Sequence, residues 1–155
     1  KPTISGAGRH TYKVDKSNVS EVNQNFLELV KEEDFIIQEF QKNIVSKGEV
    51  AVVLINGEYT HAILKLAKKG DFRVQDDFGG TVHDYDPNQD MITLAQESIK
   101  SLSPTPVYAR VDIIWDNNNN MAVSELELIE PELWFRNNPS AAVKIAKVLK
   151  EKVVS

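Results

Sequence analysis

Three acidic residues and one arginine lie where a single β-hairpin would bring them together. They are Asp112, Glu125, Glu127 and Arg110, within residues 107–129. Apolar residues alternate with polar ones before and after a run of four asparagines, which is typical of two antiparallel strands joined by a tight turn. A register symmetric about the middle of this run places Asp112 opposite Glu125 and Arg110 opposite Glu127, with all four side chains on one face.

Such an arrangement of acids indicates a cation site. Directly opposed acidic side chains have Cβ atoms only about 5 Å apart, and like charges in that position destabilise a sheet unless positive charge lies between them. Carboxylate oxygens are the ligands that Mg²⁺ prefers, with water and substrate phosphates as its remaining ligands. The alternative is a solvated polar face in which Arg110 alone neutralises the acids, and the pattern by itself leaves both interpretations open.

Composition limits the classes of protein to consider. The 155 residues suit one domain or two small lobes, and the net charge of −5 argues against a surface for nucleic acid or anionic lipid. The absence of cysteine excludes disulfides and thiolate metal sites and is compatible with a cytoplasmic location. No apolar run approaches the roughly 20 residues needed to span a bilayer. Since the sequence begins with Lys1, we expect a fragment of a longer protein.

Three amphipathic helices are predicted from apolar residues at helical spacing. The first covers residues 19–30, with Asn18 and Glu21 placed as an N-terminal cap and its returning acid. The second follows Pro87, and the third begins at Pro139.

Strands are predicted around these helices, so the expected fold is α+β, mainly antiparallel sheet with flanking helices. Asn56 and Gly57 are the strongest short turn signal in the chain and join two of the strands as a hairpin. The strands predicted outside the acidic hairpin are residues 35–40, 49–55 and 58–65.

Arg73 stands alone in a strand-like segment that precedes the paired glycines Gly79 and Gly80. Its planar fork suits a phosphate or a carboxylate. The structural alternative is a salt bridge to Asp76 or Asp77, which the composition of the segment favours.

Together these segments resemble the ATP-grasp superfamily, and within it the glutathione-synthetase-like carboxylate–amine ligases. The resemblance covers nearly the whole chain, and several motifs occur in the family's order. One departure is Glu127, because the family usually has asparagine there, and the extra negative charge affects metal affinity and phosphate repulsion. The matching motifs are Lys1-Pro2 with Ser5 to Gly8, Gln38 to Phe40, Gly48-Glu49, Asn56 to Ala62 with Lys65, Gly70 to Gln75 with Gly79-Gly80, Arg110 to Asp112, and Glu125 to Glu127 with Pro131.

The resemblance implies roles for individual residues. Asp112, Glu125 and Glu127 would bind Mg²⁺ or Mn²⁺, and Arg73 would steady the transferring phosphoryl group. Lys65 would be a further helper, although without the resemblance it would be interpreted as an ordinary surface lysine. The remaining residues expected to contact ATP are Lys1 at the phosphates, Gln38, Glu39 and Phe40 at the adenine, and Glu49.

The implied function is ATP-dependent ligation. A substrate carboxylate would attack the γ-phosphate to give an acylphosphate, from which an amine or related nucleophile displaces phosphate. We expect a lid-like lobe over about residues 1–37 and a main lobe over about 38–155, with a substrate-binding N-terminal domain missing in cis. The fragment alone is therefore expected to be inactive. The alternatives are a nucleotide-binding or regulatory module without turnover, and a structural domain held by ion pairs.

Overall fold

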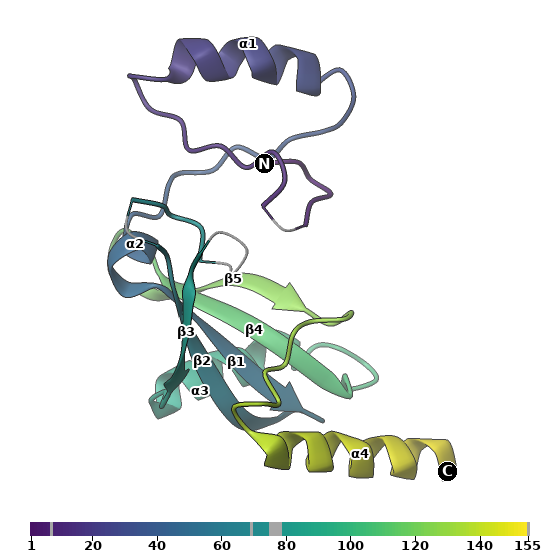
Figure 1. Cartoon of the computed structure of the whole chain (residues 1–155). Helices are drawn as coiled ribbons and strands as arrows, with labels where there is room; N and C mark the ends of the chain where they lie inside the picture. The colour runs from purple at the N-terminus through teal and green to yellow at the C-terminus, as the bar shows by residue number, and fades with distance from the viewer. Residues whose placement is uncertain (7, 69, 75–78, 155) are drawn as a thin grey trace. The chain divides into compact units, whose positions relative to one another are not determined.

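The computed structural model describes residues 1–6, 8–68, 70–74 and 79–154 (Figure 1). It contains two compact units, Lys1–Phe40 and Gln41–Ser155. The roles of lid and main lobe remain predictions for these units. No helix in the described ranges is long and apolar enough to cross a membrane.

The first unit is built on one helix, α1 (Val19–Leu29), and a short pairing between its two ends. Pro2 and Phe35 form an antiparallel bridge, and the terminal ammonium of Lys1 donates to the carbonyl of Ile36 at 3.1 Å. The Phe35 ring also packs edge-on against Phe26 of α1, with ring centroids 5.1 Å apart. Helix α1 has no buried residue.

Two predictions for this unit are wrong. Residues 35–40 do not form a strand, because the pairing with the N-terminal segment ends at the bridge through Phe35. The predicted cap of α1 is also absent, because Asn18 accepts a hydrogen bond from the backbone N–H of Asp15 at 2.9 Å and makes no cap bond to the helix. The asparagine therefore stabilises the turn before α1.

The second unit is a five-stranded antiparallel sheet in the order β3-β2-β1-β4-β5, which confirms the predicted α+β class. The sequence did not predict α2 or β3, which are the two shortest elements of the chain. The elements of this unit are α2 (Asn43–Lys47), β1 (Glu49–Ile55), β2 (Glu58–Leu66), β3 (Thr81–Tyr85), α3 (Gln89–Ile99), β4 (Tyr108–Trp115), β5 (Met121–Glu127) and α4 (Pro139–Val154).

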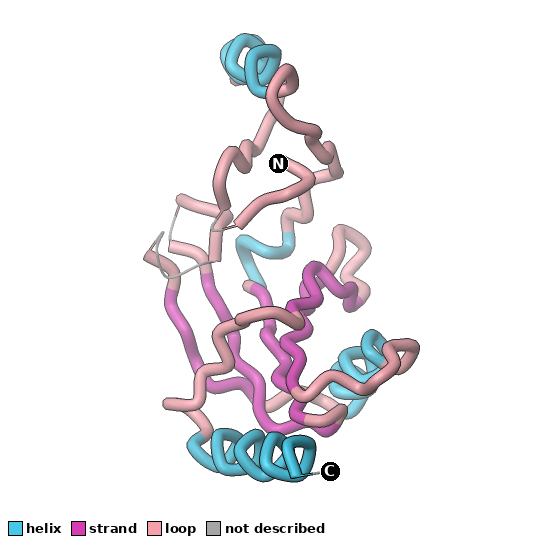
Figure 2. Tube along the Cα trace, turned by 90° about the vertical axis from the view of Figure 1, so that its right-hand side faces the viewer, coloured by secondary structure: helices cyan, strands magenta, loops and turns pink. Residues whose placement is uncertain are grey.

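One face of the sheet carries the main hydrophobic core against α3. Three buried residues of this helix, Met91, Ala95 and Ile99, pack against alternate residues of β1, β2 and β4. The helix begins where predicted, because the Asn88 side chain accepts a hydrogen bond from the N–H of Met91 at 3.0 Å. Figure 2 shows α3 and α4 lying on different sides of the strands.

On the opposite face of the sheet, the side chains change from apolar to charged along the strands. At the end near α4, Val53 and Ile55 of β1 pack with Leu133 and with the inward side of that helix. At the middle of β1, Ala51 packs with Trp134. At the start of β1 the alternation reaches Glu49, a buried acid, so charged side chains must find partners at this end.

Gly48, just before β1, has no room for a side chain. Its φ is +74°, and an added Cβ would lie 2.3 Å from the carbonyl oxygen of Lys65. Gly57 is a matched control, because its φ of +80° is similar but the nearest atom to an added Cβ lies 3.4 Å away. Left-handed backbone alone costs about 1–2 kcal/mol in either variant. We expect Gly48→Ala to lose clearly more free energy of unfolding than Gly57→Ala in urea denaturation, and equal losses would contradict this.

Candidate functional site

The acidic hairpin has the predicted pairing but reaches it through a β-bulge. Asp112 pairs with Glu125 and Arg110 with Glu127, as expected, whereas Ile113 pairs with Val123. Ser124 is therefore an extra residue in β5. Between the turn and the bulge, the pairing of the two strands is symmetric about Asn118. The bulge shifts the pairing by one residue, and this shift places Glu125 and Glu127 on the same face of the sheet as Asp112.

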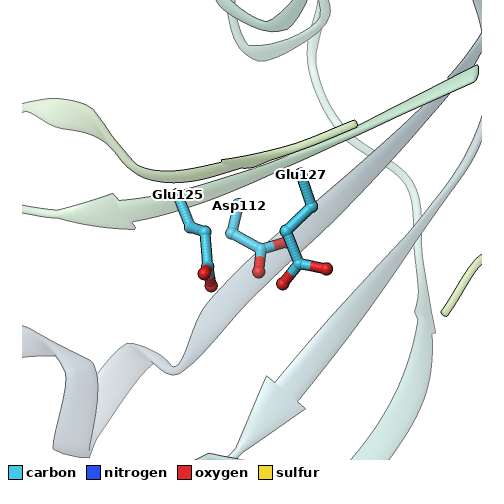
Figure 3. A group of neighbouring side chains, drawn as sticks. All are labelled: Asp112, Glu125 and Glu127. Carbon is cyan, nitrogen blue, oxygen red and sulfur yellow. The ribbon is translucent and has the colours of Figure 1, made fainter. Parts of the chain in front are cut away.

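The three carboxylates converge, as Figure 3 shows. Each of Asp112, Glu125 and Glu127 offers one oxygen, and these oxygens all lie within 4.8 Å of one another. Oxygens on opposite sides of one hard cation lie roughly 4 to 5 Å apart, so the spacing of these oxygens suits a single divalent ion. Asp112 is fully buried, whereas the Glu125 side chain is 57% exposed and thus faces an open side of the site.

Arg110 lies among these acids. Its Nε donates to Asp112 Oδ1 at 3.0 Å and its Nη2 to Asp112 Oδ2 at 2.9 Å. The same Nη2 also bonds to Glu127 and lies 3.8 Å from Glu125. Burial acts to lower the pKa of Arg110, but Asp112 and the two glutamates outweigh it and raise the pKa.

Lys65 is the second cation of the site, and its interpretation as a surface lysine is wrong. The residue is 7% exposed, and its ammonium lies 2.5 Å from Glu49 and 2.8 Å from Asp112. Burial acts to lower the pKa of Lys65, but Glu49 and Asp112 outweigh this effect and raise it. The structure therefore joins two residues expected at the nucleotide, Glu49 and Lys65, to the candidate metal ligands.

Ser124, the bulge residue, also takes part. Its hydroxyl oxygen lies 3.0 Å from Glu49 Oε2 and 3.0 Å from the backbone oxygen of Asp112, so it links β5 to both β4 and β1. We did not predict this residue. The sequence holds no signal for it, because four residues separate the asparagines from Asp112 on one side and from Glu125 on the other, as in a symmetric hairpin without a bulge.

The cluster carries an excess of negative charge. Its four carboxylates outnumber its two cations by two, which is the charge of one divalent ion. The pKa of Glu49 is raised by burial despite its contact with Lys65. The pKa of Glu125 is also raised, first by burial and then by Glu127 and Asp112. Both pKa values are thus raised mainly by burial, and neighbouring carboxylates add to the effect.

Trp134 borders the two cations. Its ring centroid lies 5.5 Å from the Arg110 guanidinium carbon and 5.9 Å from the Lys65 ammonium, which is within the range of cation–π attraction. The sequence offered no periodic signal for this contact, because Trp134 lies in the irregular segment between β5 and α4.

Arg73 is held by a neighbour in the sequence. Its guanidinium donates to Asp71 at 3.1 Å and 2.7 Å, and the pKa of Asp71 is lowered mainly by these hydrogen bonds. Asp76 and Asp77, the partners of the structural alternative, lie outside the described residues. A salt bridge therefore exists, but with a different acid, and the role of Arg73 at a reaction centre remains a prediction.

The other residues expected at ATP belong to the first unit. Lys1 contributes its terminal ammonium to the pairing with Ile36, as described above. The ammonium of Lys13 lies 4.4 Å from the centroid of the Phe40 ring, so this aromatic side chain already makes one cation contact. Roles at the nucleotide for Lys1 and for the predicted adenine contacts, Gln38, Glu39 and Phe40, remain predictions.

The family follows from a match to the sequence. The profile described as prokaryotic glutathione synthetase, ATP-grasp domain, matches residues 1–125. The chain belongs to this ATP-grasp family. The predicted family is thus confirmed, and the match includes Asp112 and Glu125 but ends before Glu127. None of the curated protein sequences matches the chain.

Solved structures share the fold of this ATP-grasp chain. The D-cycloserine synthetase DcsG matches with a TM-score of 0.82 at 24% identity, over 98% of this chain and 54% of that one. The D-alanine–D-alanine ligase from Bacillus anthracis, complexed with ATP, matches with a TM-score of 0.52 at 18% identity, over 88% of this chain and 45% of that one. The chain therefore spans about half the length of each.

Loss of Lys65 should destabilise the fold in a pH-dependent way. Lys65→Met leaves Glu49 and Asp112 without their shared cation, which typically costs about 3–5 kcal/mol. Glu49 already has a raised pKa, and the variant raises it further, so folding then disfavours its ionised form. The loss should be small below the unfolded pKa of about 4.3 and should increase as the pH rises above it.

Urea denaturation at pH 4 and pH 7 tests this. Lys144→Met is the control, because Lys144 pairs with the exposed Glu58 at 2.5 Å and should cost less than about 1 kcal/mol. A loss for Lys65→Met that is equal at both pH values would contradict the role given to Glu49.

Proposed function

We propose that this chain is the nucleotide- and metal-binding part of an ATP-dependent ligase that joins a carboxylate to an amine or related nucleophile. The observation that carries the proposal is the convergence of Asp112, Glu125 and Glu127 in a chain of this family. The reaction would activate the carboxylate as its acylphosphate, using the γ-phosphate of ATP, and the nucleophile would then displace phosphate. The substrates would be small molecules, bound with help from the rest of the protein.

The three acids would hold Mg²⁺ or Mn²⁺. When bound, the ion would supply positive charge to phosphate oxygens of ATP. Asp112 is the fixed member of this set, because it is buried and contacts both Lys65 and Arg110. Glu125 is the adaptable member, because its side chain is more than half exposed.

Arg73 would orient the transferring phosphoryl group. Asp71 holds its side chain through two hydrogen bonds, so the planar fork is already oriented before a substrate binds. Lys1 would contact the phosphates of ATP, and residues 38–40 would contact its adenine. Residues 1–155 alone are proposed to lack turnover, since positioning two substrates against ATP needs the surface that the rest of the protein supplies.

The alternative is a module that binds nucleotide without turnover. Binding of Mg·ATP by the whole protein, with no release of ADP in the presence of any carboxylate and amine, would support this module. A structural domain is the other alternative, and one observation favours it: Arg110 contacts all three acids, so the cluster also has a structural explanation as a set of ion pairs.

The first test of the ligase is mutation of the acids. In the whole protein, Asp112→Asn and Glu125→Gln should each abolish ADP production measured by a coupled assay against a panel of amino acids. The reason is that each variant removes a charged oxygen ligand from the site. Glu97→Gln is the control, because Glu97 is an exposed acid paired with Lys100 on α3. Near-normal turnover in both site variants would refute the assignment.

The second test concerns Arg73. Arg73→Lys keeps the charge but loses the two-pronged geometry, so kcat should fall at least a hundredfold while the unfolding midpoint changes little. Arg136→Lys is the control, because Arg136 forms an exposed pair with Glu132, four residues earlier in the chain. Full activity of Arg73→Lys would contradict the role proposed for Arg73 at the phosphoryl group.

A further inference from the structure

Trp134 is held in an unfavourable state. Its φ is +42°, a conformation that bulky residues rarely adopt. The side chain is 5% exposed, and its indole Nε1 has no hydrogen-bond partner in the part of the chain that the structure describes. Strain and unpaired donors persist where the surroundings fix them, and they are frequent at functional sites.

The surroundings do fix this residue. The preceding carbonyl, of Leu133, accepts a hydrogen bond from His61 Nε2 at 2.9 Å, and the carbonyl of Trp134 accepts one from the N–H of Asn137 at 2.9 Å. The ring packs against Ala51 in the apolar middle of the sheet. The two hydrogen bonds hold the backbone in place, and turning the ring to find a partner for Nε1 would break its packing against Ala51.

The strained conformation of Trp134 places its ring in contact with Arg110. The centroid of the ring lies 5.5 Å from the guanidinium carbon of Arg110, so the ring attracts this cation. Nη2 of the same guanidinium contacts Asp112, Glu125 and Glu127. A cation bound by all three carboxylates would need the space that this nitrogen occupies. The arginine is thus a competitor for the metal, and the ring stabilises the competing arrangement.

We propose that Trp134 is a positioning residue that holds Arg110 among the three carboxylates and thereby weakens the binding of a divalent cation. The inference rests on the proposed function, because it takes the three acids as metal ligands. An interaction shifts an equilibrium between two arrangements only by the difference in its free energy between them, and the ring interacts with Arg110 in the arrangement without metal. Removing the ring therefore strengthens metal binding, whereas a purely structural role of Trp134 predicts weaker or unchanged binding.

The experiment measures Mn²⁺ dissociation constants by electron paramagnetic resonance of the free ion. Trp134→Leu keeps apolar volume without a ring face, and it should bind Mn²⁺ about two- to thirtyfold more tightly than the unmodified chain, which is the range expected for a cation–π contact. Trp134→Phe should lie between the two. Trp115→Phe is the control and should change the constant less than twofold, because Trp115 faces Lys47 instead.

Two further measurements separate the explanations. With Arg110→Gln as background, Trp134→Leu should no longer change Mn²⁺ affinity, because the ring acts through the arginine. In the Trp115→Phe variant Trp134 is the only tryptophan, and its fluorescence should change as Mg²⁺ is added, since a cation leaves its ring. This second readout does not depend on whether the other variants fold.

The outcomes distinguish the two proposals. If the unmodified chain binds no Mn²⁺ at millimolar concentration, the metal site under the proposed function fails. If it binds Mn²⁺ but Trp134→Leu and Trp134→Phe bind equally well or more weakly, or if the Trp134 fluorescence does not respond to Mg²⁺, only the role of Trp134 is wrong.

Discussion

A fully buried aspartate in the middle of the sheet is the constraint on which the rest of the second unit depends. Asp112 is out of reach of water, so its charge is tolerable only because Lys65 and Arg110 both bond to it. Lys65 in turn requires Glu49, and Arg110 requires Glu127. The charged end of this sheet face is therefore one connected network spanning four strands, which restricts how those strands can be aligned.

Much of this arrangement could be predicted from local patterns. The Asn56-Gly57 turn signal predicted the two strands that it joins. Alternation predicted the acidic hairpin, and helical spacing predicted α1, α3 and α4, because each of these two patterns is repeated several times within its element. The strand predicted for residues 35–40 does not form, although an apolar run is typical of a strand. A strand needs a second strand paired along its length, and the pairing here is the single β-bridge between Pro2 and Phe35. Short elements such as α2 and β3 repeat too few periods to be recognised.

The contacts that complete the site were less predictable, since they join segments far apart in the sequence. Lys65 and Asp112 are 47 residues apart, and burial of that lysine follows only from the order of strands in the sheet. Trp134 lies outside any periodic element, so its place beside Arg110 depends on the path of a loop. The pairing of the acids was predicted correctly, although from a turn symmetry that the bulge at Ser124 corrects.

The bulge has a consequence for how this protein behaves in concentrated solution. Strand β5 is at the edge of the sheet, and an exposed edge is a template on which another chain can add a strand and begin to aggregate. An extra residue interrupts the regular row of backbone donors and acceptors and increases the local twist. The neighbouring glutamates add repulsion between copies. The same irregularity that aims the acids at Asp112 thus makes this edge a poor nucleus for fibril growth.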